Sequence, residues 1–166
     1  MTAPRQQRKS RSAPRGLVGL LLVCGILTPF ASVAATVDRT VVNSHTGLAI
    51  SGFDPVAYFI DGKPKFGRPE LELSLGGAVW RFRNEGNRAA FSDHPEVYSP
   101  RFGGYDPVAV ARGASVPGHP LFWAVVGGRL YLFYDAKART AFIAEPGRLI
   151  DAAERKWPAV ARTLGR

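Results

Sequence analysis

Two stretches of the chain share one pattern, in which a glycine and an aromatic residue precede Asp-Pro-Val-Ala. They are residues 52–57 and residues 104–109. Aspartate is a strong N-cap, because its carboxylate accepts hydrogen bonds from the free backbone N–H groups of a first helical turn. Proline suits the next position, where no N–H is needed, and the aromatic residue can fix the start of the helix by packing on its first turn. The pattern predicts two loop-to-helix corners, capped by Asp54 and Asp106, around which the domain is built.

The segments between and after the corners favour β-hairpins. Residues 71–75 and 79–83 alternate in polarity, and residues 121–126 and 130–134 are strongly apolar. A Gly-Gly pair separates the two strands in each case, as a tight two-residue turn requires. The aromatic residues of 79–83 are expected to face the core, and its arginines to face water.

Short helices are expected beside the hairpins, because cap residues and helical spacing of apolar residues recur. They are predicted at 56–60, at 85–93 after Asn84, from Asp106 to about residue 112, at 136–144 after Asp135, and at 149–164. Pro158 should kink or divide the last of them after Trp157. The predicted fold class is α+β: two antiparallel hairpins alternate with short capped helices, and a C-terminal helix covers the sheet. Apart from the two corners, we find no internal repeat.

The N-terminus has the order of an export signal. Residues 1–15 are polar and basic, residues 16–30 carry no charge, and residues 31–35 are mostly small. This order predicts a signal peptide over 1–35, read by the general secretory route and cleaved after Ala34 or Ala35, so that the protein is periplasmic or secreted. An uncleaved membrane anchor and a lipid attached at Cys24 are the alternatives. A polar lead at 36–46 and one domain at 47–166 would follow.

The net charge of +9 does not indicate a nucleic-acid partner, because five of the positive charges lie within the first 15 residues. From residue 36 onward there are 17 Lys and Arg against 13 Asp and Glu, and they are interspersed. Such a surface does not predict nucleic-acid binding. The membrane is an expected partner only through the N-terminal segment, if it stays uncleaved. Cys24 is the only cysteine, so the mature chain would have no disulfide.

The order of motifs resembles the YHS domain family, in particular its exported bacterial members. The segments that carry the resemblance are Ser51–Phe59, Trp80–Phe82, Asn87–Phe91, Pro95, Tyr98, Pro100, Gly103–Tyr105, Trp123, Leu130–Leu132 and Trp157–Pro158. They extend from residue 47 to about residue 160. The resemblance implies a small α+β module similar to treble-clef-like domains, and a loose association with heavy-metal transport or sensing. Its exported members generally have no assigned activity.

The chain departs from the family at the second corner. Exported relatives typically read Gly-Gly-Tyr-Cys-Ala, whereas this chain has Asp106-Pro107 in place of Cys-Ala. A thiolate suits soft metal ions, but a carboxylate is a hard ligand and also an ordinary helix cap. Asp106, His94 and His119 are the remaining metal candidates. They show no ligand spacing, so no cofactor is evident and a metal ion is only an alternative.

The sequence contains no nucleophile motif or phosphate loop, and we do not expect an enzyme. Only a pair formed by Asp54 and Asp106 would offer acid–base chemistry, and helix capping explains both residues equally well. The expected function is that of an exported accessory module, which binds an unidentified small ligand or protein partner. The candidate ligand-binding residues lie in the aromatic, Asp-capped region between the corners: Tyr58, Tyr105, Asp106, Asp54 and Trp123. The alternatives are that these aromatic residues simply pack in the core, or that the protein is metal-associated with a weakened or lost site.

Overall fold

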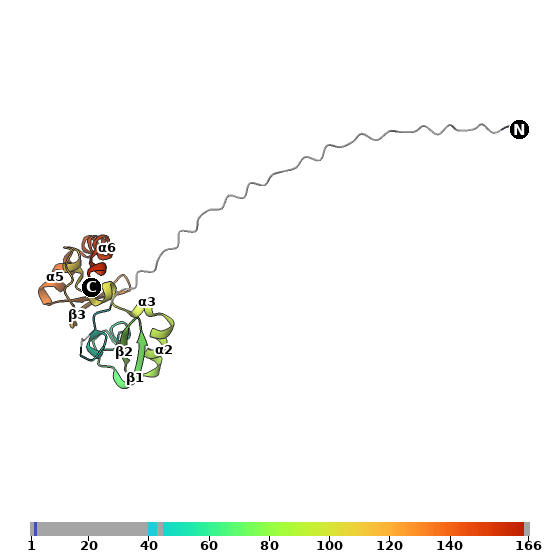
Figure 1. The fold of residues 1–166 in the computed structure, drawn as a ribbon, viewed down its shortest axis with the longest axis horizontal. Helices are drawn as coiled ribbons and strands as arrows, with labels where there is room; N and C mark the ends of the chain where they lie inside the picture. Colours follow the sequence, from blue (N-terminus) through green and yellow to red (C-terminus); the bar gives the residue numbers. More distant parts are fainter. Residues whose placement is uncertain (1, 3–39, 43–44, 165–166) are drawn as a thin grey trace. The chain divides into compact units, whose positions relative to one another are not determined.

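The computed structural model describes Thr2 and residues 40–42 and 45–164 (Figure 1). The predicted signal peptide and most of the polar lead lie outside these residues. Within the described part of the chain, no helix is long and apolar enough to span a membrane.

The fold class is α+β, as predicted, with two separate two-stranded antiparallel sheets and short helices. The first half of the domain, residues 47–100, contains η1 (Ile50–Gly52), α1 (Ala57–Ile60), β1 (Arg68–Leu75), β2 (Ala78–Phe82), α2 (Glu85–Asp93) and α3 (Pro95–Tyr98). The second half, residues 101–164, contains η2 (Arg101–Gly104), α4 (Pro107–Val110), β3 (His119–Val126), β4 (Arg129–Phe133), α5 (Ala136–Ala144) and α6 (Pro146–Thr163).

The two halves have the same order of elements, so the expectation of no repeat beyond the corners is wrong. Each half runs from a 3-10 turn through a corner helix and a hairpin to two further helices. The strands β3 and β4 and the helix α5 each begin 51 residues after β1, β2 and α2. What recurs is backbone geometry, in the turns, corners and caps. Most side chains on the hairpins differ, which hides the duplication from a search for similar residues.

Local signals formed most of these elements as predicted, but α3 was not expected and α6 begins at Pro146 rather than at residue 149. The Asn84 side chain accepts a hydrogen bond from the backbone N–H of Asn87 at 2.8 Å, and Asp135 caps Ala138 in the same way at 2.7 Å. Both glycines of each hairpin turn have positive φ, a conformation that glycine adopts without strain.

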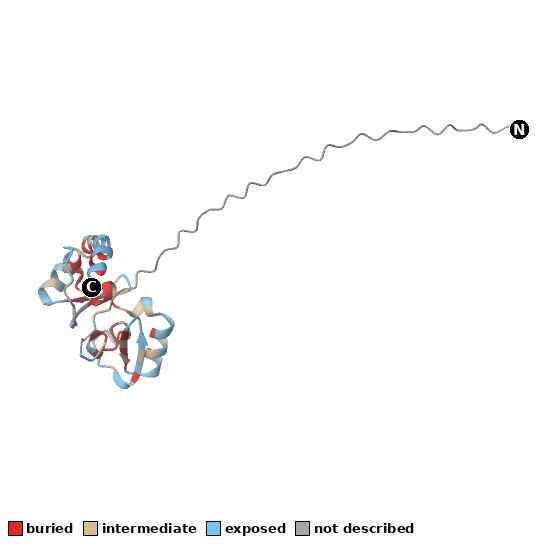
Figure 2. Ribbon diagram, in the orientation of Figure 1, coloured by how far each residue is buried: buried red, intermediate tan, exposed pale blue. Residues whose placement is uncertain are grey.

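Buried residues occur in both halves of the domain (Figure 2), and the strand β4 contributes to two core clusters. Leu130 and Leu132 are buried in a cluster with residues of the first half, whereas Tyr131 and Phe133 are buried in a cluster with α5 and α6. Side chains alternate between the faces of a strand, so a strand buried on both faces is apolar throughout. This explains the continuous apolar run in the second hairpin.

The first hairpin is covered on one face only. Trp80 and Phe82 are buried, as predicted. On the other face Glu72 lies opposite Arg81 and accepts a hydrogen bond from its Nε at 2.7 Å. The equivalent cross-strand pair of the second hairpin is Trp123 and Leu132, which packs on the core of the first half.

A glycine in each half lets the corner approach its hairpin. Gly67 donates its N–H to the carbonyl of Gly52, and Gly118 donates to Gly104, both at 2.9 Å. A Cβ atom on Gly67 would lie 2.3 Å from the carbonyl carbon of Arg81, and one on Gly118 would lie 2.6 Å from Leu132 Cβ. Only glycine fits at either position.

The helix α6 continues through Pro158, so the predicted division after Trp157 is wrong. Pro158 is exposed, and the buried stripe of Trp157, Val160 and Ala161 extends to both sides of it. The Trp157 ring lies 5.6 Å from the Phe102 ring, edge to face. Burial of this stripe outweighs the hydrogen bond that a proline cannot donate.

Replacing Pro158 by alanine is expected to raise the free energy of unfolding by about 1–2 kcal/mol, since an exposed interior proline lacks an intrahelical hydrogen bond and carries a helix penalty of that order or more. Denaturant unfolding measures the change. Ala159→Ser, at the neighbouring exposed position, is the control and should have little effect. A loss of stability in Pro158→Ala would show that the proline ring itself is needed for packing.

Candidate functional site

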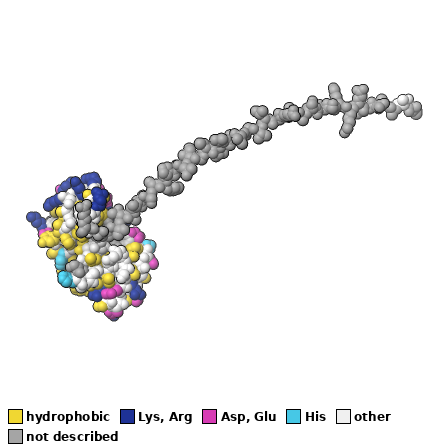
Figure 3. Space-filling model, in the orientation of Figure 1, with side chains coloured by type: hydrophobic (Ala, Val, Ile, Leu, Met, Phe, Trp, Pro, Cys, Tyr) yellow, Lys and Arg dark blue, Asp and Glu magenta, His cyan; other side chains and the backbone are white. Residues whose placement is uncertain are grey.

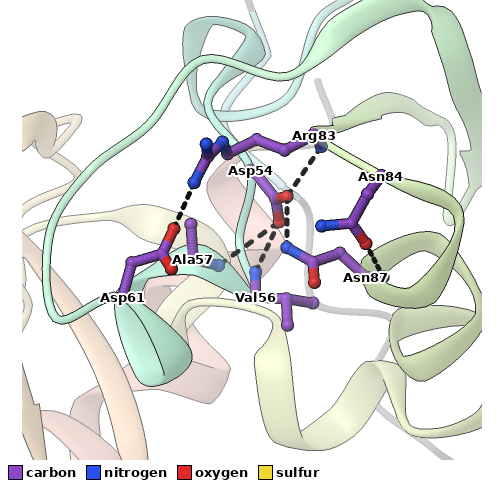
Figure 4. A network of polar contacts seen from close by, with 7 residues as sticks. All are labelled: Asp54, Val56, Ala57, Asp61, Arg83, Asn84 and Asn87. Carbon is purple, nitrogen blue, oxygen red and sulfur yellow. Dashed lines mark hydrogen bonds and ion pairs between the residues drawn. The ribbon is translucent and has the colours of Figure 1, made fainter.

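Asp54 is a fully buried structural carboxylate (Figure 4). Its Oδ1 accepts hydrogen bonds from the backbone N–H groups of Val56 at 2.8 Å and Ala57 at 3.3 Å. Its Oδ2 accepts from the backbone N–H of Arg83 at 2.8 Å and from the side-chain amide of Asn87 at 2.7 Å. These donors come from the first corner, the end of β2 and α2. Asp54 therefore joins three elements, and groups of the protein itself supply all four of its hydrogen-bond donors.

Asp106 occupies the same place in the second half with fewer partners. Its side chain is buried, with 3% of the residue exposed. Its Oδ1 accepts from the backbone N–H of Val108 at 2.8 Å, and its Oδ2 accepts from that of Tyr134 at 2.9 Å. Both oxygens thus take part in joining the corner to the end of β4. No other donor among the described residues bonds to this carboxylate.

Asp106 lacks a side-chain donor because one equivalent position of α2 and α5 carries different residues. Asn87 is the third residue of α2, and Ala138 is the third residue of α5. Alanine has no amide to offer, so Asp106 Oδ2 lacks the side-chain donor that Asp54 Oδ2 has.

A hollow of about 280 Å³ lies beside Asp106. We call it the Asp106 hollow. Acidic, basic, aromatic and small apolar side chains line it: Asp106, Val108, Ala109, Arg112, Val116, Tyr134, Asp135, Lys137, Ala138 and Ala141. All of these residues belong to the second half. Asp106, whose Oδ2 accepts one hydrogen bond, and Ala138 thus both line the same concave site.

The predicted aromatic residues are placed elsewhere. The hydroxyl of Tyr58 is buried and donates to the carbonyl of Pro120 at 3.0 Å, and its ring lies 5.3 Å from that of Trp123, edge to face. Burial, and secondly the charge of Asp54, raise the pKa of Tyr58 well above its usual value. The Tyr105 ring lies 6.0 Å from that of Trp157. Tyr58 and Trp123 thus help to hold the two halves together, and none of the three lines the Asp106 hollow.

The predicted metal candidates His94 and His119 do not line the Asp106 hollow either. His94 is exposed and its Nδ1 lies 3.7 Å from Glu96 Oε1. His119 is exposed at the start of β3, and its Nδ1 accepts a hydrogen bond from the backbone N–H of Leu121 at 3.2 Å. In the part of the chain that the structure describes, no three His, Cys, Asp or Glu side chains form a group able to hold a metal ion.

Sequence reasoning found Asp106 but missed the residues that make its surroundings distinctive: Asn87 as the partner of Asp54, and Ala138, Arg112 and Lys137 at the hollow. Aligning the two halves on their Gly-Gly turns would have set Asn87 against Ala138.

Comparison with family models, with curated proteins and with solved structures found no match to the chain.

Proposed function

We propose that the protein is an exported accessory module that binds a small ligand in the Asp106 hollow, through an N–H donor of the ligand and Oδ2 of Asp106. Export is inferred from the order of residues 1–35, and the kinship with exported YHS domains from the order of motifs between residues 47 and 160. The proposal needs no catalytic group.

One observation carries the binding proposal: two equivalent buried aspartates have unequal numbers of donors. A carboxylate offers about four acceptor sites. Asp54 receives four hydrogen bonds, whereas Asp106 receives two from the described residues. A buried charged acceptor gains from each further donor. A ligand that supplies one would replace what Asn87 supplies in the first half.

The Asp106 hollow is suited to a small molecule. Its volume of about 280 Å³ is close to the lower end of the range, roughly 300–1,000 Å³, that is usual for small-molecule pockets. Half of its lining residues are valine or alanine, and the polar groups of Asp106, Asp135 and two cations lie among them. An apolar wall with few convergent polar groups is the usual character of a ligand site.

Replacing Ala138 by asparagine should close the site by copying the first half. The new amide should occupy the hollow and donate to Asp106, so binding of isovaleramide, a small neutral probe with an apolar chain and a primary amide, should fall at least tenfold. The measurement is an NMR titration of full-length protein, followed at the backbone amides of Val108 and Tyr134.

Ala138→Val is the matched control, because it fills the same volume without a donor. It should also weaken isovaleramide binding, but only Ala138→Asn should raise the melting temperature. If isovaleramide causes no shifts in the wild-type protein, or the same shifts in Ala138→Asn, the hollow is not a ligand site of this kind.

A further inference from the structure

The Asp106 hollow carries cations as well as a buried carboxylate. Arg112 and Lys137 line it, and both are exposed. Among the described residues, no carboxylate lies within ion-pair distance of either one, whereas Arg81, Arg83, Arg101 and Arg148 each have such a partner. Their charges are therefore open to a ligand.

The first half has neither cation. Counted from the two aspartates, Arg112 corresponds to Ile60, and counted from the hairpins and following helices, Lys137 corresponds to Gly86. The half that lacks the asparagine donor is thus also the half that has two unpaired cations at the same site. Helix capping by the aspartate explains neither the loss of the asparagine donor nor the presence of the two cations, since the first half is capped with the asparagine and without the cations.

The whole second half is richer in positive charge. Residues 101–166 contain ten Lys and Arg against five Asp and Glu, whereas residues 47–100 contain six against seven. Lys and Arg gather over α6 in Figure 3, whereas both signs of charge are visible on the first half. Two of these cations, Arg112 and Lys137, line the Asp106 hollow.

We infer that the ligand is a small zwitterion, an α-amino acid with an apolar side chain. This inference rests on the proposed function of the Asp106 hollow. The ammonium group would donate to Asp106 Oδ2, the carboxylate would face Arg112 and Lys137, and the side chain would lie against Val108 and Val116.

Other classes of ligand satisfy only part of the site. A simple amine would pair with the carboxylates of Asp106 and Asp135 but would be repelled by the two unpaired cations. A simple carboxylate would be attracted by the cations but repelled by the two aspartates. Each charge of a zwitterion meets its opposite, and charge-assisted hydrogen bonds are about twice as strong as neutral ones.

The test compares four probes on full-length protein by NMR titration: L-valine, isobutylamine, isovalerate and isovaleramide. L-Valine should bind at least tenfold more tightly than isobutylamine and isovalerate. In Arg112→Gln/Lys137→Gln the advantage of L-valine over isobutylamine should vanish. Arg155→Gln/Lys156→Gln removes two exposed cations that do not line the hollow, and should leave the order of affinities unchanged.

The amino-acid assignment is overturned if L-valine binds no better than isobutylamine, or if its advantage survives in Arg112→Gln/Lys137→Gln. Binding of isovaleramide that is lost in Ala138→Asn would still uphold the proposed function in that case. If neither isovaleramide nor L-valine binds the wild-type protein, both proposals fail together.

Discussion

Replacing Asp54 by alanine is expected to lower the free energy of unfolding by about 4 kcal/mol or more. The change leaves four donors without an acceptor in a fully buried site: three backbone N–H groups and the amide of Asn87. Each buried donor left without a partner costs about 1–3 kcal/mol, and part of this loss is recovered when water enters. Equilibrium unfolding in urea, followed by tryptophan fluorescence, measures the loss.

Asp106→Ala is the matched comparison, since the same carboxylate in the second half has two donors. Its cost should be about 2 kcal/mol, roughly half as large. Equal losses for the two variants would contradict the view that Asp106 has spare acceptor capacity, and would weaken the binding proposal with it.

Replacing Gly118 by alanine is expected to cost about 3 kcal/mol, because the added Cβ would lie 2.6 Å from Leu132 Cβ and 2.7 Å from the carbonyl oxygen of Gly104. Those atoms belong to β4 and to the second corner, and neither can move without disturbing a core. Gly67→Ala should cost as much, because its closest neighbour is the backbone carbonyl carbon of Arg81. Thermal unfolding of the variants measures both losses.

Gly147→Ala is the control, since an added Cβ there meets no atom within 4 Å and the residue lies in α6. It should be neutral or stabilising by up to about 1 kcal/mol, because alanine is a better helix former than glycine. A loss at Gly147 as large as that at Gly118 would mean that the close approach is not the cause.

The predictions that depended on local chemistry were confirmed. Asn84 and Asp135 cap the helices that follow them, and Asp54 and Asp106 cap the corners. Such signals act within a few residues, between a side chain and a nearby backbone group. They can therefore be recognised without knowledge of the tertiary structure.

The predictions that depended on distant contacts were less complete. Pro158 breaks a helix by local rules, yet α6 continues through it because Trp157 and Val160 are buried on other elements. The two-sided burial of Leu130 and Tyr131 likewise depends on which half each face meets. No local pattern contains that information.

The Asp106 hollow was beyond reach of the sequence for a related reason. It arises from a side chain that is short, Ala138, at a position where the other half has Asn87. A missing side-chain amide produces no sequence motif. It can be recognised only by comparing the equivalent positions of the two halves.

The ion pair of Glu72 and Arg81 gives one face of the first hairpin a different character from the equivalent face of the second. In the second hairpin the same face is apolar and docks onto the unit before it. A further unit, or another molecule, that approached the first hairpin in the same way would have to bury two charged side chains where Trp123 and Leu132 offer hydrocarbon. Terminal units of repeat proteins remain soluble through such polar outer faces. The pair thus disfavours head-to-tail docking of another molecule on this face.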